Sequence, residues 1–327
     1  MAKYFVTGAT GFIGGEIVKQ LIGRGHKVVA LVRSPEKAGM LKALGVEMHA
    51  GDITNRDTLR APMEGADGVF HMAAWYKVGV HEPLADQINV DGTRNVLKTM
   101  RTLQIPRGVY TSTVAVFSDT KGAVPDETYR YDGSHLSDYD RTKWIAHYRV
   151  AVPRMEAGLP LMIVMPGLVY GPGDTSGVHT ALVDLLRGRL PMTPARTAFC
   201  WAHVEDTARG HILAMEKGTP GETYIITGPQ HTFEYVFDVA AKLAHVRAPL
   251  LHPGPRTMRS MAALMKLVGR FANLPPSLTP EALRVLAGTT YFGSNAKAVR
   301  ELGFTARPIE EGLAQTLEHE LRALGRA

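Results

Sequence analysis

The chain has 327 residues, 45% of them hydrophobic, which is enough for one large domain or two closely packed ones and excludes disorder of the whole chain. Lys and Arg outnumber Asp and Glu by 37 to 31, but they are scattered, so the composition gives no sign of nucleic-acid binding. The single cysteine, Cys200, excludes an intrachain disulfide, and neither a signal-like N-terminal segment nor an apolar run of about 18 residues is present. We therefore expect a cytoplasmic protein that is not secreted and does not span a membrane.

Short apolar runs alternate with longer segments of helical periodicity from residue 3 to about residue 170. This alternation is typical of parallel strands joined by crossover helices, and it predicts an α/β fold with a doubly wound parallel sheet. Beyond residue 171 the strands become shorter, and helices dominate from Phe233 onwards. We therefore divide the chain into a first domain, residues 1–170, and a smaller, mainly helical region, residues 171–327, which can receive crossing elements from the first. The predicted strands are Lys3–Thr7, Lys27–Val32, Glu47–His49, Gly68–Met72, Gly108–Ser112 and Leu161–Met165.

A glycine-rich turn follows the first predicted strand and opens a helix that extends to about residue 23. This order of strand, turn and helix is the context that a dinucleotide-binding turn requires. Gly8 permits the sharp exit from the strand, Gly11 lets a pyrophosphate approach the backbone, and Gly14 lets the helix pack on the strand. The unpaired N–H groups at the helix N-terminus attract phosphate. The expected contacts of this turn with a dinucleotide come from Gly8, Thr10, Gly11, Phe12, Ile13 and Gly14.

Arg33 stands at the end of the second strand, where an acidic residue would hold the ribose hydroxyls of NAD. A cation at this place can pair with a 2′-phosphate, so we favour NADP(H) and keep NAD(H) as the alternative. A solvent-exposed loop arginine is the other interpretation of Arg33. His71 is interpreted as a buried histidine with satisfied hydrogen bonds. Further cofactor contacts are expected where later strands end, at Asp52, Ile53, Ala73, Ala74, Pro166 and Val169.

Tyr139 and Lys143 stand four residues apart in a helical stretch, residues 138–156, so both side chains project from one helix face. An ammonium group beside a tyrosine favours the phenolate, so we expect Lys143 to lower the Tyr139 pKa from its ordinary value of about 10. Thr113, at the end of the fifth strand, is expected to hydrogen-bond a substrate carbonyl or alcohol, with Ser112 as the neighbouring alternative. This set suits hydride transfer coupled to general acid/base proton transfer.

Six segments, spread over essentially the whole chain, resemble the extended short-chain dehydrogenase/reductase family. They are TGATGFIG (7–14), YTSTVAVF (110–117), YDRTK (139–143), MPGLVYGPGD (165–174), HVEDTARGHILAMEKG (203–218) and SNAKAVRELGF (294–304). The resemblance implies a Rossmann fold, an NAD(P)-dependent enzyme, and a Ser/Thr-Tyr-Lys catalytic set that falls on Thr113, Tyr139 and Lys143. It also implies that Asn89 lies near the active site, although a merely polar helix position is the alternative.

Two subgroups of this family compete: sugar-nucleotide epimerases or dehydratases, and carbonyl reductases resembling dihydroflavonol and cinnamoyl-CoA reductases. Epimerases of the family carry a diphosphate-gripping arginine where this chain has Phe199, and an asparagine where it has Leu168. Because an unpaired buried phosphate is costly, these departures favour an apolar pocket. The expected pocket walls, each of which could instead be plain core, are Tyr76, Met165, Leu168, Tyr170, Phe199 and Trp201.

The favoured function is therefore NADP(H)-dependent reduction of a ketone or aldehyde on a bulky, largely apolar small molecule, without a metal. Arg187 and Arg196 as anion contacts, and the segment Trp75-Tyr76-Lys77 beside the nicotinamide, keep a sugar or sugar-nucleotide epimerase as the alternative. A non-catalytic dinucleotide sensor is less favoured, because it would need none of the three catalytic side chains.

Three helical segments bear on the partners of the chain. In relatives, the helices at residues 83–103 and 138–156 form a dimer seam, which implies a homodimer, although Val90, Val96 and Leu97 could instead cover the sheet. Residues 257–270 combine methionines and leucines with basic residues at helical spacing. We interpret this segment as an amphipathic helix lying on the domain rather than as a membrane-surface or partner helix, and leave open whether it forms a lid.

Overall fold

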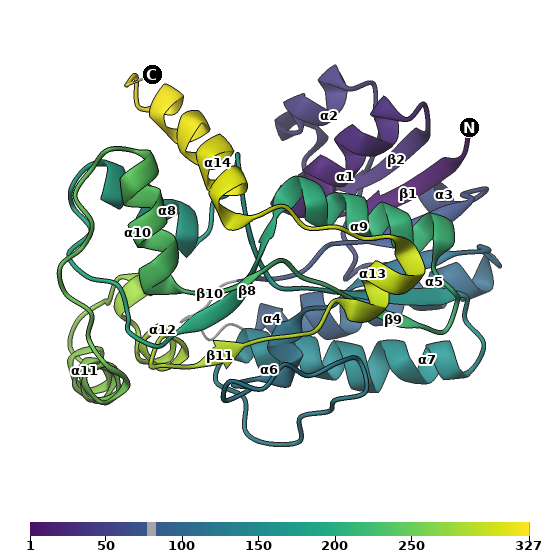
Figure 1. Ribbon diagram of the computed structural model, residues 1–327. Helices are drawn as coiled ribbons and strands as arrows, with labels where there is room; N and C mark the ends of the chain where they lie inside the picture. Colours follow the sequence, from purple (N-terminus) through teal and green to yellow (C-terminus); the bar gives the residue numbers. More distant parts are fainter. Residues whose placement is uncertain (77–82, 327) are drawn as a thin grey trace.

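A seven-stranded parallel sheet forms the centre of the molecule in the computed structural model, which describes residues 1–76 and 83–326 (Figure 1). The strand order is β3-β2-β1-β4-β5-β6-β9, so the doubly wound parallel sheet is confirmed. The first six strands lie within one residue of their predicted bounds. The strands are β1 (Lys3–Thr7), β2 (Lys27–Val32), β3 (Glu47–Ala50), β4 (Gly68–His71), β5 (Gly108–Thr111), β6 (Leu161–Pro166) and β9 (Thr223–Ile226).

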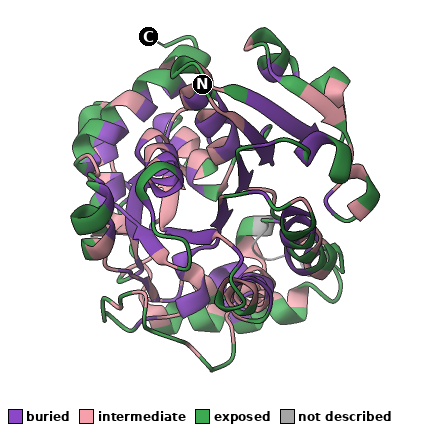
Figure 2. Cartoon of the chain, turned by 90° about the vertical axis from the view of Figure 1, so that its right-hand side faces the viewer, coloured by how far each residue is buried: buried purple, intermediate pink, exposed green. Residues whose placement is uncertain are grey.

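Helices cover both faces of this sheet, because each strand alternates its apolar side chains between two separate cores. In β1, Tyr4 and Val6 belong to one core and Phe5 to the other. Figure 2 shows the buried strands inside and the exposed outer faces of the helices around them. The first core is covered by α1 (Phe12–Gly23), α2 (Gly39–Ala43), α9 (Val204–Lys217) and α13 (Ala296–Leu302). The second is covered by α3 (Arg60–Met63), α5 (Thr93–Thr102), α6 (Asp138–Ile145) and α7 (Val152–Glu156).

Two long helical stretches on the second face each contain a wide, π-helical segment. α4 (Leu84–Asp86) continues through η3 (Gln87–Gly92) into α5, and α6 continues through η5 (Ala146–Ala151) into α7. The second stretch therefore passes through Pro153 without ending, because the wide turn lies directly before this residue, whose ring would clash with a regular helix. Val90, Val96 and Leu97 are buried in the core beneath α5, so these three side chains cover the sheet.

The C-terminal region forms a second, smaller sheet around β8, flanked by its own helices. α8, α10 and α14 enclose a third core around Tyr170 and Trp201. Residues 204–226 return to the large sheet as α9 and β9, so the chain crosses the division drawn at residue 170. The strands are β7 (Leu168–Tyr170), β8 (Ala198–His203), β10 (Gln230–Thr232) and β11 (Thr290–Tyr291). The helices are α8 (Gly177–Leu186), α10 (Phe233–Leu243), α11 (Pro255–Val268), α12 (Pro280–Val285) and α14 (Ile309–Ala323).

Short 3₁₀ helices fill several connections. They are η1 (Pro35–Lys37), η2 (Arg56–Thr58), η4 (Val114–Phe117) and η6 (Pro276–Leu278). Within residues 1–76 and 83–326, we find no helix with the length and apolarity needed to cross a membrane.

Candidate active site

The glycine turn between β1 and α1 is packed so closely that two of its positions exclude a side chain. Gly8 has a left-handed φ of +72°, and a Cβ atom there would lie 2.7 Å from the backbone nitrogen of Ala73. A Cβ atom on Gly14 would clash with the carbonyl oxygen of Gly8. The turn therefore holds β1, the start of α1 and the chain after β4 in contact with one another.

The mouth of this turn fits a dinucleotide. Thr10 and Gly11 are exposed, and Gly11 caps α1 without a side-chain hydrogen bond, which leaves the first N–H groups of the helix available to phosphate. Phe12 and Ile13 are partly exposed in the first turn of the helix. Among the described residues, a Cβ atom at Gly11 would meet only the carbonyl oxygen of Gly8, which leaves room for a ligand above the turn.

The other expected cofactor residues lie at the same carboxyl-terminal edge of the sheet. Arg33 is exposed directly after β2. The carboxylate of Asp52 accepts hydrogen bonds of 2.9 Å from both the backbone nitrogen and the hydroxyl group of Thr54, while Ile53 is buried. Of the remaining four residues, Ala73 and Ala74 follow β4, which lies beside the reversal of strand order, whereas Pro166 ends β6 and Val169 lies in β7 of the smaller sheet.

Lys143 is buried and points back to the end of β5. Its ammonium group donates to the carbonyl oxygen of Thr111 at 2.6 Å and to the hydroxyl group of Tyr110 at 3.2 Å, and it lies 4.7 Å from the centre of the Tyr110 ring. Only 3% of the residue is exposed. Burial lowers the pKa of Lys143 to about 7, so its charge is only partly present at neutral pH.

Tyr139 lies one helical turn before Lys143, against the ring of Tyr76. The two tyrosine rings meet edge to face with their centres 4.8 Å apart. Burial, followed by the proximity of Tyr76, raises the pKa of Tyr139, whereas a hydrogen bond with the hydroxyl group of Thr113 lowers it. The net shift is upward, so the expectation that Lys143 lowers this pKa is wrong for the protein without its cofactor. The reason is that desolvation outweighs a lysine that is itself close to neutral.

The two hydroxyl groups after β5 point to different partners. Thr113 faces Tyr139 and accepts a hydrogen bond from the backbone nitrogen of Ala115 at 3.1 Å. The hydroxyl group of Ser112 lies 2.7 Å from Nδ1 of His147, which is buried. The phenol of Tyr139 thus interacts with the hydroxyl group of Thr113, while the hydroxyl group of Ser112 is engaged by His147.

His71 and Asn89 have structural partners in this structure. His71 lies between the hydroxyl groups of Thr7 and Thr93, at 2.8 and 3.0 Å, and burial lowers its pKa to about 3. The backbone nitrogen of Trp75 donates to the side-chain oxygen of Asn89 at 2.7 Å. The side-chain nitrogen of Asn89 donates to the carbonyl oxygen of Trp75 at 3.1 Å and to the hydroxyl group of Thr142 at 2.9 Å. Asn89 thus fixes the chain after β4 to the helix that carries Tyr139.

No pattern in the sequence indicates a buried carboxyl group next to Tyr139. Asp140 is 3% exposed, and one of its oxygens accepts a hydrogen bond of 3.0 Å from the hydroxyl group of Tyr291 in β11. The ring of Tyr291 stacks on that of Phe199 with their centres 5.4 Å apart. Burial raises the pKa of Asp140 to about 7. Tyr291 lies 151 positions after Asp140, and no local sequence pattern indicates that two residues so far apart are paired.

The expected pocket walls divide into two groups. Met165, Tyr170 and Trp201 are each 1% exposed and pack in the hydrophobic cores. Tyr76 is 56% exposed, and Leu168 and Phe199 are partly exposed. Of the six expected walls, these last three are the ones with exposed surface, and the expected Lys77 lies outside the described residues.

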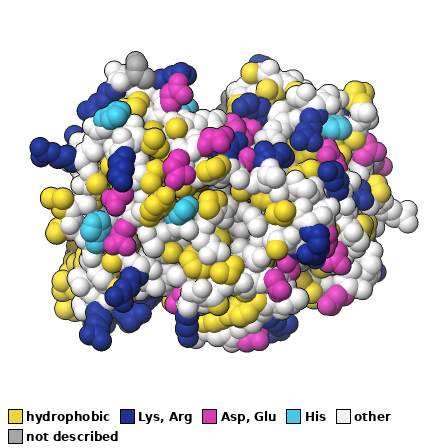
Figure 3. All heavy atoms as spheres, viewed as in Figure 1, with side chains coloured by type: hydrophobic (Ala, Val, Ile, Leu, Met, Phe, Trp, Pro, Cys, Tyr) yellow, Lys and Arg dark blue, Asp and Glu magenta, His cyan; other side chains and the backbone are white. Residues whose placement is uncertain are grey.

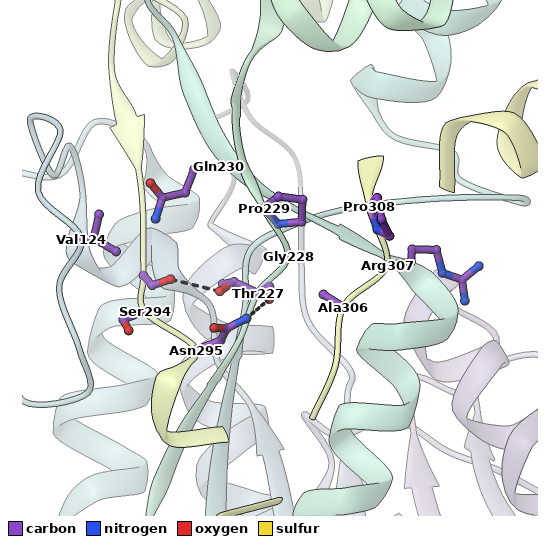
Figure 4. A pocket seen from close by; sticks show the side chains of 11 residues that line it. Val124, Thr227, Gly228, Pro229, Gln230, Ser294, Asn295, Ala306, Arg307 and Pro308 are labelled. Carbon is purple, nitrogen blue, oxygen red and sulfur yellow. Dashed lines mark hydrogen bonds between the residues drawn. The ribbon is translucent and has the colours of Figure 1, made fainter. Parts of the chain in front are cut away.

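Two further features bear on where a substrate could bind: the two arginines expected as anion contacts, and an open groove on another part of the molecule. Arg187 and Arg196 are both exposed at the surface. Figure 4 shows the groove, of about 570 Å³, between the segments after β9 and around α13. Its walls are tied together by hydrogen bonds, such as that from the Asn295 amide to the carbonyl oxygen of Thr227 at 2.7 Å. None of the expected catalytic, cofactor or pocket residues lines it.

The fold and this arrangement define a dinucleotide-binding α/β enzyme with a Tyr/Lys helix. The model of the NAD dependent epimerase/dehydratase family matches residues 4–227. The chain belongs to this family, within the extended short-chain dehydrogenases/reductases, and is an NAD(P)-dependent dehydrogenase or reductase.

Similar proteins span nearly the whole chain. "Sterol demethylase protein B" of Methylococcus capsulatus is 32% identical over 320 residues, which cover 95% of this chain and 96% of that protein. A "putative dihydroflavonol 4-reductase" of Synechocystis is 30% identical, covering 96% and 93%. The solved structure of gox2253 is 30% identical with a TM-score of 0.86 and covers 100% of this chain and 99% of that one. A UDP-glucose 4-epimerase of Thermotoga maritima, 22% identical with a TM-score of 0.77 and covering 98% and 99%, shares the fold.

Proposed function

We propose that this enzyme interconverts a ketone or aldehyde and its alcohol on a bulky, largely apolar small molecule, with NADP(H) as the favoured cofactor. The observation that carries the proposal is the contact of the Tyr139 phenol with the Thr113 hydroxyl group, next to the exposed ring of Tyr76. A phenol and a hydroxyl group that converge on one point can both hydrogen-bond a single substrate oxygen.

The bound cofactor supplies hydride from its nicotinamide ring. Tyr139 donates a proton to the substrate oxygen, and Thr113 holds this oxygen by a hydrogen bond. The phenol is protonated at neutral pH, since its pKa lies above the ordinary value of about 10, so its proton is present for donation in the direction of reduction. Lys143 would hold the nicotinamide ribose. A negatively charged group close to Lys143 would favour the charged form of its amino group.

The cofactor preference rests on Arg33. Its exposed guanidinium group directly follows β2, beside the strand that carries the glycine turn. A guanidinium group binds a phosphate through paired, charge-assisted hydrogen bonds, whereas the ribose hydroxyls of NAD call for an acceptor. This favours a cofactor with a 2′-phosphate.

The apolar character of the substrate rests on Leu168 and Phe199. The ring of Phe199 is stacked on Tyr291 and meets Phe233 edge to face, with ring centres 5.4 and 5.6 Å apart. This aromatic cluster occupies the place where the resemblance puts the diphosphate-gripping arginine of epimerases. The names of the similar proteins, a sterol demethylase and a dihydroflavonol reductase, agree with a polycyclic or aromatic substrate.

Turnover measurements on a substrate panel test the proposal. The purified enzyme is supplied with NADPH or NADH and with sterol ketones, aromatic ketones, aliphatic aldehydes and UDP-sugars in turn. We expect net NADPH consumption with at least one apolar carbonyl compound. Conversion of a UDP-sugar with bound NAD and no net redox change would instead establish the epimerase.

A further inference from the structure

Helix α11 is attached to the molecule by one narrow face. Met258 and Ala262 are buried, and they pack against Leu283 and Ala287 at α12. Figure 1 shows α11 at the lower left edge of the molecule, outside the two sheets. Most of the helix surface is therefore available to a binding partner.

Large apolar side chains occupy part of this free circumference. Leu264 and Leu267 are 55% and 54% exposed and lie one turn apart on the same side of the helix. Phe271, in the turn that ends the helix, is 85% exposed. Exposed phenylalanine and leucine side chains grouped at one edge mark an interaction site rather than ordinary surface.

The same segment is strongly cationic. No Asp or Glu occurs between Asp238 and Glu281, although acidic residues are nearly as common as basic ones in the whole chain. Figure 3 shows dark blue and yellow side chains together at the lower left, where Figure 1 places α11. The basic residues in this interval are Lys242, Arg247, Arg256, Arg259, Lys266 and Arg270.

Although the sequence alone favours a helix that lies on the domain, only a narrow face of α11 is buried, and we propose that α11 and the turn after it dock on the surface of a membrane that contains anionic phospholipids. An exposed helix with leucine and phenylalanine on one side, arginine and lysine beside them, and low overall hydropathy is the pattern of an interfacial helix. The apolar side chains enter the boundary of the lipid tails, and the basic side chains bind the phosphate groups. A second copy of the chain fits this surface poorly, because a symmetric contact would bring the basic residues of both copies together.

The docking surface is connected through α12 to the proposed apolar wall of the substrate site. The chain passes from α11 through α12 to β11, where Tyr291 stacks on Phe199. Val285 of α12 packs against the same core as Tyr291. An enzyme docked in this way could take an apolar substrate from the membrane, and this part of the inference rests on the proposed function. The docking itself does not.

Flotation of the full chain with lipid vesicles tests the docking without any enzyme assay. One set of vesicles contains phosphatidylcholine alone, and the other also contains phosphatidylglycerol, both at physiological salt. We expect at least about 10-fold stronger partition into the anionic vesicles, because several basic side chains contribute. Equal partition into both sets, or none into either, overturns the proposal.

Apolar variants separate insertion from simple charge attraction. Replacement of Leu264, Leu267 and Phe271 by Gln is expected to abolish flotation. The matched control replaces Met40 and Val299, which are 50% and 47% exposed elsewhere, by Gln and is expected to float like the wild type. If the α11 variant instead dissociates a dimer seen by sedimentation, the surface is an interface between copies and the proposal fails.

Charge variants test whether the basic residues of α11, rather than the net charge of the whole chain, attract the anionic vesicles. Each Lys or Arg to Glu replacement lowers the net charge by two, so either of two triple variants brings the net charge from +6 to zero. The triple variant on α11 is expected to lose the preference for anionic vesicles. The triple variant on exposed residues elsewhere is expected to keep this preference. Equal losses in both variants would overturn the proposal. The triples are Arg256, Arg259 and Lys266, and Lys42, Lys98 and Lys121.

Discussion

The hydroxyl group of Tyr291 donates a hydrogen bond of 3.0 Å to the buried carboxyl group of Asp140, and this contact joins the Tyr/Lys helix to the small sheet. Asp140 directly follows Tyr139, and Tyr291 stacks on Phe199. The proposed proton donor and the proposed apolar wall are therefore fixed relative to each other by one pair of side chains. We infer that Asp140 and Tyr291 are positioning residues rather than catalytic ones.

Loss of the Tyr291 hydroxyl group is expected to weaken this link. In Tyr291→Phe, the Asp140 carboxyl group loses a buried donor, which costs about 1–3 kcal/mol of unfolding free energy. Denaturant unfolding measures this change. Tyr148→Phe is the matched control, because its hydroxyl group bonds the carbonyl oxygen of Tyr129 at an exposed place, and there we expect a change within about 0.5 kcal/mol. Equal losses in both variants would show that the Asp140 contact has no special weight.

The raised pKa of Asp140 makes a distinct prediction about pH. The folded state holds the proton up to a pKa of about 7, whereas the unfolded chain releases it near about 3.9. Between these values the folded state binds more protons, so this group's contribution to stability falls as the pH rises. Asp140→Asn cannot titrate, so the stability of the wild type relative to this variant should decline from pH 4 to pH 7 and then level off, roughly following these two pKa values. A flat or rising difference in unfolding free energy would contradict the assignment.

The glycine turn allows a comparison within one helix. A methyl group at Gly14 would clash with the Gly8 carbonyl oxygen, whereas one at Gly23 meets nothing within 4 Å. We expect Gly14→Ala to lose about 1–3 kcal/mol of stability by overpacking and to bind dinucleotide weakly. Gly23→Ala should gain about 0.5–1 kcal/mol, because alanine favours the helix. Thermal unfolding and tryptophan fluorescence titration with NADPH measure both effects, and similar behaviour of the two variants would argue against the tight turn.

Charge reversal at Arg33 tests the cofactor preference. In Arg33→Asp, the carboxylate repels a 2′-phosphate and accepts hydrogen bonds from ribose hydroxyls, so preference should shift from NADPH towards NADH. The ratio of kcat/KM for the two cofactors measures the shift. Lys37→Asp, an exposed change in the neighbouring η1, controls for general charge. An unchanged ratio in Arg33→Asp would make Arg33 an ordinary surface residue.

The features that could be predicted from the sequence are those that depend on a local pattern or on the family resemblance. The first six strands, apart from β3, have short apolar runs, and the glycine turn has fixed spacing, so these features could be located from the sequence. The short strand β9 was not predicted, because it lies far along the chain in a region of mixed pattern. The pairing of Asp140 with Tyr291 and the upward pKa shift of Tyr139 depend on tertiary packing, which no local pattern encodes. Trp201 and Phe199 are both aromatic, and only the packing around them makes one a core residue and the other partly exposed.

Turnover of Tyr139→Phe is the most direct test of the central proposal. The variant keeps the ring and its contact with Tyr76 but lacks the proton, so we expect NADPH-dependent reduction to fall at least about 100-fold while dinucleotide binding is retained. Tyr148→Phe serves as the control and should turn over like the wild type. Loss of reduction with intact binding would support Tyr139 as the proton donor, whereas near-wild-type turnover of Tyr139→Phe would contradict it.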